Sequence, residues 1–240
     1  MSEPADQAPD AADPSSAGAR PNEEMTESMR EVMSLEGDVD KLSAYYARWA
    51  SYYDADVAEH GYGLPRMMLA AVWAASDRDE AAARYLDRSV PVLDAGCGTG
   101  LVGSIMHEAG YTNLNGVDLS HEMVERARER GIYRSIEGGV DLSRPVPEYL
   151  RGRAAIVLVG GVFTVGHIPP ESLAVVADLA APEGLLVVST RRSYQESTDF
   201  VAVQQAMVDA GRLELLAHLP DAPYTMDSTG DYWAWRVSGG

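Results

Sequence analysis

Three glycines, Gly96, Gly98 and Gly100, stand at alternate positions directly after the apolar run and the acid of residues 92–95 (VLDA). Glycine lets a chain turn sharply and lets a ligand contact the backbone. The helix that we expect to begin after Gly100 also presents unpaired N–H groups at its N-terminus. This segment therefore has the chemistry of a ligand-binding loop between a strand and a helix, with Asp94 at the end of the strand.

A second acid, Asp118, follows the next apolar run, 24 residues after Asp94. An acid at the end of the second strand of such a sheet commonly binds the hydroxyls of a ribose. Residues 98–103 (GTGLVG) also match the dinucleotide fingerprint, so a nicotinamide enzyme is an alternative. We favour the alternate-glycine interpretation for two reasons. Asp94 directly precedes the loop, and the single lysine, Lys41, does not form the Tyr-x-x-x-Lys motif of short-chain hydride transfer.

The composition excludes several classes of protein. The chain has 240 residues, 46% hydrophobic and 23% charged, which suits one globular domain with extensions. Its net charge is -18, and residues 1–40 carry half of it, so we expect neither nucleic acid nor a membrane surface as partner. The lone Cys97 supplies neither a disulfide nor a zinc cluster, and we expect no metal. Since no apolar run reaches the roughly 20 residues of a membrane span and no signal segment is visible, we expect a cytoplasmic protein.

Composition divides the chain into three parts. Residues 1–22 contain no leucine, isoleucine, valine or aromatic residue, so we expect a disordered acidic tail. Residues 23–76 have the apolar spacing of helices, including helices over 23–33 and 39–59, and we expect them to form an N-terminal helical lid. Residues 77–240 contain the strand-like runs and form the predicted ligand-binding domain.

Strands and helices alternate along this third part. Four apolar runs have strand length: residues 90–93, 114–117, 154–163 and 185–188. Segments of helical period separate them, and two of these, 101–109 and 120–130, end at a glycine. Continuous apolar strands between helices predict a three-layer α/β sandwich with a doubly wound, mostly parallel, Rossmann-like sheet. Residues 213–219 and 232–237, joined by a turn-rich stretch, predict an antiparallel last pair.

Residues 92–100 (VLDAGCGTG) closely resemble motif I of the class I S-adenosylmethionine-dependent methyltransferases. From about Tyr45 to the C-terminus, the further motifs stand in that family's order: residues 46–54 (YARWASYYD), 116–120 (GVDLS), 140–142 (VDL), 161–167 (GVFTVGH) and 182–188 (PEGLLVV). In detail, the chain is most similar to the Williams-Beuren-type methyltransferase-like branch. The resemblance implies a seven-stranded sheet and S-adenosylmethionine as the cofactor.

The resemblance also implies a cofactor site. Asp94 and the three loop glycines would surround the amino-acid part of the cofactor. Asp118 would bind the ribose hydroxyls, Leu119 would contact one face of the adenine, and Asp141 and Leu142 would lie beside the adenine edge. Gly160 and Gly161 would line the cleft where the sulfonium lies. Tyr46 and Tyr53 would close the cleft from the N-terminal helix. The two tyrosines are seven residues apart and share one helix face, and aromatic rings stabilise a cation such as a sulfonium.

We assign catalysis to His167 and Tyr53. His167 stands just past the fourth predicted strand, at the sheet edge where the methyl group should point, and histidine can accept a proton near neutral pH. Arg191 and Arg192 follow the fifth predicted strand. They could anchor a carboxylate of an acceptor, and a solvated surface pair is the alternative.

The function that these observations predict is transfer of a methyl group from S-adenosylmethionine to a small-molecule acceptor, as in secondary metabolism. One alternative consumes the same cofactor without methyl transfer, by cyclisation to azetidine-2-carboxylate with release of methylthioadenosine. The aromatic lid suits this reaction, and Val165 stands where the branch often carries a second histidine. A weaker alternative is a non-catalytic nucleotide-binding module whose acidic tail contacts a partner. The sequence does not indicate an oligomeric state.

Overall fold

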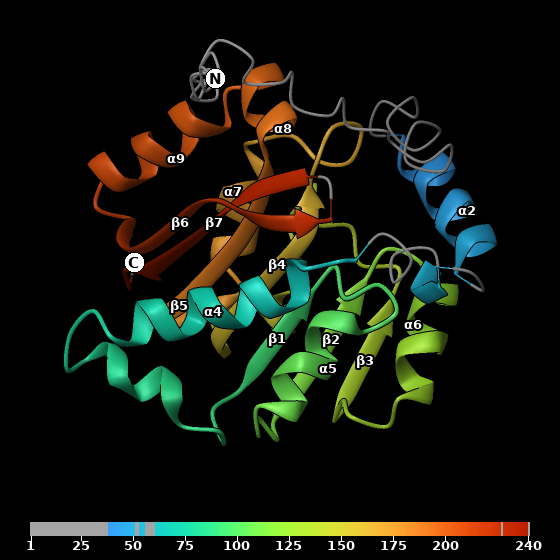
Figure 1. Ribbon diagram of the computed structural model, residues 1–240, viewed down its shortest axis with the longest axis horizontal. Coiled ribbons are helices and arrows are strands. Elements are labelled where there is room, and N and C mark those ends of the chain that lie inside the picture. The colour runs from blue at the N-terminus through green and yellow to red at the C-terminus, as the bar shows by residue number, and fades with distance from the viewer. Residues whose placement is uncertain (1–37, 51–52, 56–60, 227, 240) are drawn as a thin grey trace, which may run out of the picture.

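A seven-stranded sheet with the strand order β3-β2-β1-β4-β5-β7-β6 forms the centre of the molecule (Figure 1). The computed structural model describes residues 38–50, 53–55, 61–226 and 228–239. The tail expected over residues 1–22 and the helix expected over 23–33 lie outside the described residues.

Five of the strands run parallel: β1 (Val92–Ala95), β2 (Leu114–Asp118), β3 (Ser135–Gly138), β4 (Ala154–Phe163) and β5 (Ala180–Arg191). All four residues of β1 are buried, as are the aliphatic residues at the centres of β4 and β5. Such strands are covered on both faces, which explains their continuous apolar sequence. Because β1 pairs with β2 on one side and with β4 on the other, the carboxyl ends of these three strands meet at one edge of the sheet.

The last two strands, β6 (Leu213–Thr225) and β7 (Ser228–Val237), form an antiparallel pair, and β7 lies antiparallel to β5. The predicted mixed sheet with its antiparallel last pair is thus confirmed. Arg191 at the end of β5 is opposite Gly230 of β7. A Cβ at Gly230 would lie 2.8 Å from the ring of Tyr224, so this glycine allows β6 to bring Tyr224 close to the end of β5.

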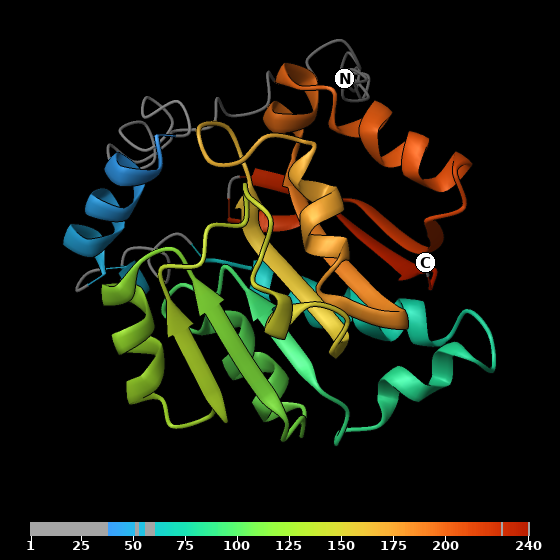
Figure 2. The ribbon, with the colours of Figure 1, turned by 180° about the vertical axis from the view of Figure 1, so that it is seen from behind.

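Helices cover both faces of the sheet, which confirms the three-layer sandwich (Figures 1 and 2). One face is covered by α4 (Leu64–Ser76), the 3-10 helix η1 (Ala82–Leu86) and α5 (Leu101–Glu108), and the other by α7 (Ser172–Ala177), α8 (Arg192–Ser197) and α9 (Phe200–Asp209). Strand alternation directs Val92 into the first layer and Leu93 into the second. Helix α6 (His121–Glu129) packs against β2 and β3, and the short 3-10 helix η2 (Glu148–Leu150) precedes β4.

The segment expected to form the helical lid contains two helices with different surroundings. Helix α2 (Val39–Trp49) lies beyond the carboxyl edge of the sheet and packs against α6 (Figure 1). Helix α4 instead buries Leu64, Met68 and Val72 completely within the first layer. The reason is its composition: Arg66 is the only charged residue among the thirteen of α4, and a helix that is apolar nearly all round must be buried. Residues 64–76 therefore belong to the sheet's helical layer rather than to a lid.

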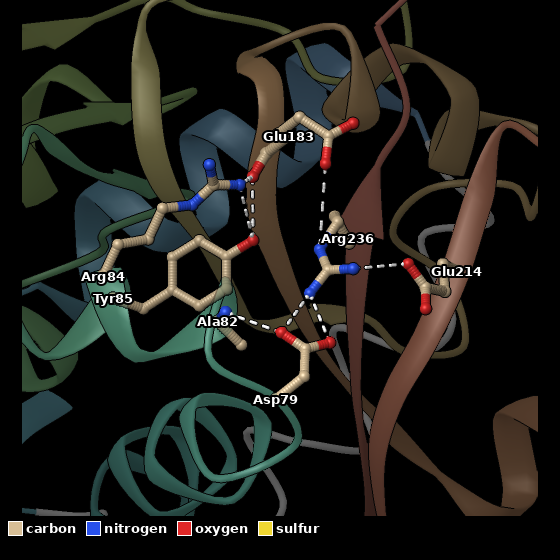
Figure 3. A network of polar contacts seen from close by, with 7 residues as sticks. All are labelled: Asp79, Ala82, Arg84, Tyr85, Glu183, Glu214 and Arg236. Atoms are coloured by element: carbon tan, nitrogen blue, oxygen red, sulfur yellow. Dashed lines mark hydrogen bonds and ion pairs between the residues drawn. The ribbon is translucent and has the colours of Figure 1, made fainter.

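A polar network holds the opposite edge of the sheet (Figure 3). Arg236 of β7 lies at its centre, with its guanidinium 2.8 Å from the Asp79 carboxylate and 2.7 Å from that of Glu214. The hydroxyl of Tyr85 donates a 2.8 Å hydrogen bond to the backbone carbonyl of Glu183. These contacts join the segment after α4 to β5, β6 and β7, and so fix the strands that end beside the predicted site.

Candidate functional site

The glycine loop turns through three left-handed residues, with φ of +77° at Gly96, +54° at Gly98 and +89° at Gly100. Residues with a Cβ rarely adopt this conformation, which explains the glycines. A Cβ at Gly98 would have no protein atom within 4 Å, whereas one at Gly96 would lie 2.3 Å from the side chain of Val162. Gly98 therefore faces open space. Gly100 is the N-cap residue of α5 and ends the turn.

Asp118 fixes the glycine loop from the end of β2. Its Oδ2 accepts a 2.7 Å hydrogen bond from the N–H of Gly98, and its Oδ1 accepts a 2.8 Å bond from the N–H of Ser120. Burial raises the pKa of Asp118, and these backbone bonds oppose that shift. A carboxylate has about four acceptor positions, so this one can still bind hydroxyl groups of a ligand.

The glycine loop, the side chain of Asp118 and helix α2 line one cavity at the carboxyl edge of the sheet. Ten of the predicted site residues line it: Tyr46, Tyr53, Gly96, Gly98, Asp118, Leu119, Asp141, Leu142, Gly160 and His167. Gly161 lines it as well, together with five apolar residues that we did not predict: Leu42, Met123, Val140, Val162 and Ile168. Helical spacing could have indicated Leu42, which lies one turn before Tyr46 on α2. For the other four, no pattern in the sequence separates the cavity wall from the core.

Two predicted site residues, Asp94 and Gly100, do not line the cavity. Asp94 is only 1% exposed, and its Oδ2 accepts hydrogen bonds from the hydroxyl of Tyr133 at 2.8 Å and from the N–H of Gly103 at 3.1 Å. Among the described residues, its Oδ1 has no hydrogen-bond partner. Burial raises the pKa of Asp94 to about 7, and the negative charge of Asp118 adds to this rise. Asp94 thus holds the start of α5 from within the core.

Asp118 gives this end of the cavity a negative charge, which also contributes to the raised pKa of Asp94 beneath it. Apolar residues form the neighbouring wall, where Leu142 is buried and Leu119 is half-buried. Asp141, which also lines the cavity, accepts hydrogen bonds from the N–H of Ser143 at 2.8 Å and from the Ser143 hydroxyl at 2.6 Å. The cavity therefore suits a ligand with an aromatic ring, hydroxyl groups and a positive charge.

A contact between α2 and the end of β4 closes the other end of the cavity. The hydroxyl of Tyr46 lies 2.6 Å from Nε2 of His167, and the other ring nitrogen of His167, Nδ1, lies 3.3 Å from the carbonyl oxygen of Val165. The carbonyl can only accept, which makes Nδ1 the protonated nitrogen and Nε2 the acceptor of the Tyr46 hydroxyl. Burial is the main cause that lowers the pKa of His167 to about 4; the hydrogen bond with Val165 opposes this shift, and the charge of Arg191 contributes to it. The imidazole is therefore neutral at physiological pH.

Further tyrosines surround the His167 end. The hydroxyl of Tyr62 donates a hydrogen bond to that of Tyr53, and burial raises the pKa of both. The rings of Tyr62 and Tyr224 meet edge to face with centroids 5.9 Å apart. A Cβ at Gly161 would lie 3.2 Å from the Tyr62 hydroxyl and 3.4 Å from that of Tyr224. Both hydroxyls therefore reach the end of β4.

A second contact joins the N-terminal part of the chain to the glycine loop. The carboxylate of Asp54 accepts a hydrogen bond from the hydroxyl of Thr99 and forms an ion pair with Arg130. Arg130 also donates from Nε to the carbonyl of Thr99. We call these three residues the Asp54 clasp. It holds the loop against the C-terminus of α6 and the helical residues 53–55.

The chemistry of the described residues is restricted in two respects. They contain no group of three or more histidine, cysteine or acidic side chains that could hold a metal ion. None of their helices is both long and apolar enough to cross a membrane.

The sheet order, the left-handed glycine loop and the acid that holds it define a class I S-adenosylmethionine-dependent methyltransferase domain. A family model described as a methyltransferase domain matches residues 70–235. The chain belongs to this family and is an S-adenosylmethionine-dependent enzyme. The described residues fit the cofactor, since the open space at Gly98 and the carboxylate of Asp118 suit a cationic nucleoside.

Known proteins similar to this chain agree with that assignment. Human methyltransferase-like protein 27 is 30% identical over 205 residues, which cover 82% of this chain and 79% of the human protein. The crystal structure of a TehB-like S-adenosylmethionine-dependent methyltransferase from Corynebacterium glutamicum has a TM-score of 0.56 at 20% identity, covering 81% of this chain and 99% of that one. The [4+2]-cyclase SpnF has a TM-score of 0.60 at 15% identity, covering 85% and 97%. At these identities the two structures show a shared fold.

Proposed function

We propose that this methyltransferase acts on a small-molecule acceptor, which meets the cofactor at the cavity end formed by Gly160, Gly161 and His167. The contact of Tyr46 with His167 is the observation that carries the proposal, because it encloses a neutral imidazole next to that end of the cavity. An enclosed site suits a small molecule better than a polymer. The net charge of -18 also disfavours nucleic acid.

Contacts and cavity lining support a role for each predicted cofactor residue. The N–H groups of the glycine loop and the carboxylate of Asp118 would bind the amino-acid part and the ribose of the cofactor. Leu119 and Leu142 would contact the adenine ring, with Asp141 at its edge. Asp94 would act from beneath the cavity, by holding the start of α5. Gly160 of β4, which lines the cavity, would lie beside the sulfonium.

S-Adenosylmethionine, when bound, supplies a methyl group that is already activated by the sulfonium. The chain therefore mainly has to orient the acceptor and exclude water. Tyr46 and Tyr53 would do this from above the cavity. A proton released by the acceptor can pass to the hydroxyl oxygen of Tyr46 while the hydroxyl proton passes to Nε2 of His167. With a pKa of about 4, His167 holds that proton only briefly and releases it to water.

The similarity to human methyltransferase-like protein 27 supports a finer assignment, to the Williams-Beuren-type branch. We also propose the division of the chain into a tail over residues 1–22, a lid formed by the part of 23–76 that precedes α4, and a catalytic domain over the remainder. The position of α2 beyond the sheet edge supports the lid.

The proposal is tested by incubating the protein with S-adenosylmethionine carrying a deuterated methyl group and a complete extract of the cells that produce it. We expect the label in a compound of low molecular mass, together with S-adenosylhomocysteine. The His167→Ala variant should bind the cofactor as the native chain does but form less labelled product. Label found only in protein or nucleic acid would overturn the small-molecule proposal.

A further inference from the structure

The wall of the cavity at its acceptor end is uncharged. It includes the following residues, none of which carries a charge at neutral pH: Tyr46, Gly161, Val162, His167 and Ile168. Among the described residues that line the whole cavity, only Asp118 and Asp141 carry a charge, and both belong to the part where the cofactor is expected. An ion at the acceptor end would lose its hydration without gaining a charged partner from this wall, which is costly.

The two arginines after β5 do not supply such a partner. Neither Arg191 nor Arg192 is among the described residues that line the cavity. Arg191 is only 9% exposed, and its guanidinium carbon lies 4.6 Å from the centroid of the Tyr224 ring, a cation–π contact. Arg192 is exposed and forms an ion pair with the carboxylate of Asp221. Both cations therefore have partners within the chain, and an acceptor carboxylate would find no cation in the cavity wall that the structure describes.

An irregularity near the end of β4 determines where Val162 lies. The pairing of β4 with β5 shifts its register between Val159 and Phe163. Within this stretch, Gly161 is left-handed, with φ of +77°, and its N–H donates a 2.9 Å hydrogen bond to the hydroxyl of the buried Ser189. Bulges beside a functional site commonly redirect a side chain. Here the redirected side chain is Val162, which lines the cavity.

Val162 lies between the two parts of the cavity. A Cβ at Gly96 would lie 2.3 Å from Cγ2 of Val162, so the valine borders the glycine loop on one side and the acceptor end on the other. Val162 and Ile168 pack against the second core layer, and both remain only half-buried where they line the cavity. Aliphatic side chains that are left partly exposed in a cavity favour an apolar ligand.

We propose that the acceptor is an uncharged hydroxy compound with an apolar body, that this body packs against Val162 and Ile168, and that Val162 limits its size. This inference rests on the proposed function, because it describes the acceptor side of the same cavity. The pair of Tyr46 and His167 gives this end of the cavity a polar contact without a charge, which suits a hydroxyl group better than an ion.

The first part of the test compares charges in the native full chain saturated with S-adenosylhomocysteine. The probes are benzyl alcohol, benzoate and benzylammonium at neutral pH, which share one ring and differ in charge. Ligand-observed NMR titrations measure the dissociation constants. We expect benzyl alcohol to bind about tenfold more tightly than either ion, because each ion would be desolvated without a charged partner.

The second part compares sizes by titrating 2-naphthalenemethanol against benzyl alcohol. Val162→Ala should raise the affinity for the larger alcohol relative to the smaller one by about tenfold, because it removes apolar volume from the cavity wall. Val165→Ala is the matched control, since Val165 is also half-buried against the second core layer but is not among the described residues that line the cavity. Val162→Ile should shift the ratio the other way, which keeps the size limit testable if Val162→Ala does not fold.

Calorimetry with S-adenosylhomocysteine, carried out first on the native chain and on each variant, separates this inference from the proposed function. If the native chain does not bind S-adenosylhomocysteine, the assignment of the cavity fails and the proposed function fails with it. If the native chain binds S-adenosylhomocysteine but does not prefer benzyl alcohol to both ions, or binds none of the three probes, the inference about the acceptor is wrong and the proposed function stands. The same ratio of affinities in the Val162 and Val165 variants would show that Val162 does not limit the size of the acceptor.

Discussion

The hydroxyl of Tyr46 lies 2.6 Å from Nε2 of His167, and this contact joins α2 to the end of β4 across 121 positions of the chain. Because the tyrosine comes from the helix above the sheet edge and the histidine from the edge itself, one hydrogen bond both closes the cavity and orients the imidazole. The ring of His167 also lies at a centroid distance of 5.7 Å from that of Tyr46. The position of α2 and the state of the predicted base are therefore coupled.

The enclosed imidazole should titrate far from its usual range. The NMR signal of the His167 Cε1–H can be assigned because it is missing from the spectrum of His167→Gln. In the native chain, the chemical shift of this signal should not change between pH 8 and pH 5.5, because burial lowers the pKa of His167 from 6.5 to about 4. Tyr46→Phe should raise this pKa, since it removes a donor to the neutral ring, whereas the neighbouring Tyr45→Phe serves as control. A midpoint near 6.5 in the native chain would show that His167 is solvated and that α2 does not enclose it.

Gly98 and Gly131 form a matched pair for testing the glycine loop. Both are left-handed, with φ of +54° and +66°, and a Cβ at either would have no protein atom within 4 Å. Alanine at each position should lower stability by a similar amount, about 1–2 kcal/mol. Only Gly98→Ala should also weaken binding of S-adenosylhomocysteine, by at least tenfold in calorimetry, because its methyl group enters the cavity. Equal affinities in the two variants would place the ligand elsewhere.

Asp94 should make stability depend on pH. Because its pKa is raised from 3.8 to about 7, its contribution to stability is present below pH 3.8 and is lost as the pH rises through 7. Each pKa unit corresponds to about 1.4 kcal/mol, so the loss between pH 4 and pH 8 is on the order of 3 kcal/mol. Urea unfolding at pH 5 and pH 8 should show that the native chain loses more stability than Asp94→Asn over this interval. Parallel pH profiles would mean that Asp94 is ionised in the folded protein throughout.

The Asp54 clasp should slow the release of the cofactor. In Asp54→Asn, we expect S-adenosylhomocysteine to dissociate about two- to fivefold faster, which corresponds to the modest free energy of a partly exposed ion pair. Stopped-flow displacement measures this rate. The control is Glu125→Gln, which breaks an exposed ion pair with Arg128 on α6. The same rate in both variants would show that the clasp does not hold the loop over the ligand.

Local patterns in the sequence were sufficient to predict most of the fold. Long apolar runs predicted β4 and β5, and the turn-rich stretch between two strand-like runs predicted the antiparallel pair. Strand β3 was not identified, because its four residues (SIEG) alternate between exposed and half-buried positions and lack a buried run. The role of α4 was also missed, since an apolar helix at the start of a chain can cover a sheet face or a cleft equally well.

The site was predicted where motifs and strand ends specify it, and missed where only tertiary contacts do. Strand ends brought Gly98, Asp118 and Gly160 to one cavity, as expected for parallel strands. The sequence contains no signal for the bond between Tyr46 and His167 or for that between Tyr133 and Asp94, because their partners come from separate elements. Likewise, adjacent positions do not reveal that Arg191 is buried and Arg192 exposed.

The central claim is that this cavity binds S-adenosylmethionine for transfer to a separate acceptor. The most direct test is mass spectrometry of the purified protein after incubation with S-adenosylmethionine alone, on both the solution and the molecules retained after rapid gel filtration. We predict that the protein retains S-adenosylmethionine unconsumed, or co-purified S-adenosylhomocysteine, without forming methylthioadenosine. Methylthioadenosine with a matching amino-acid product would contradict this account, because the cofactor would then itself be the substrate.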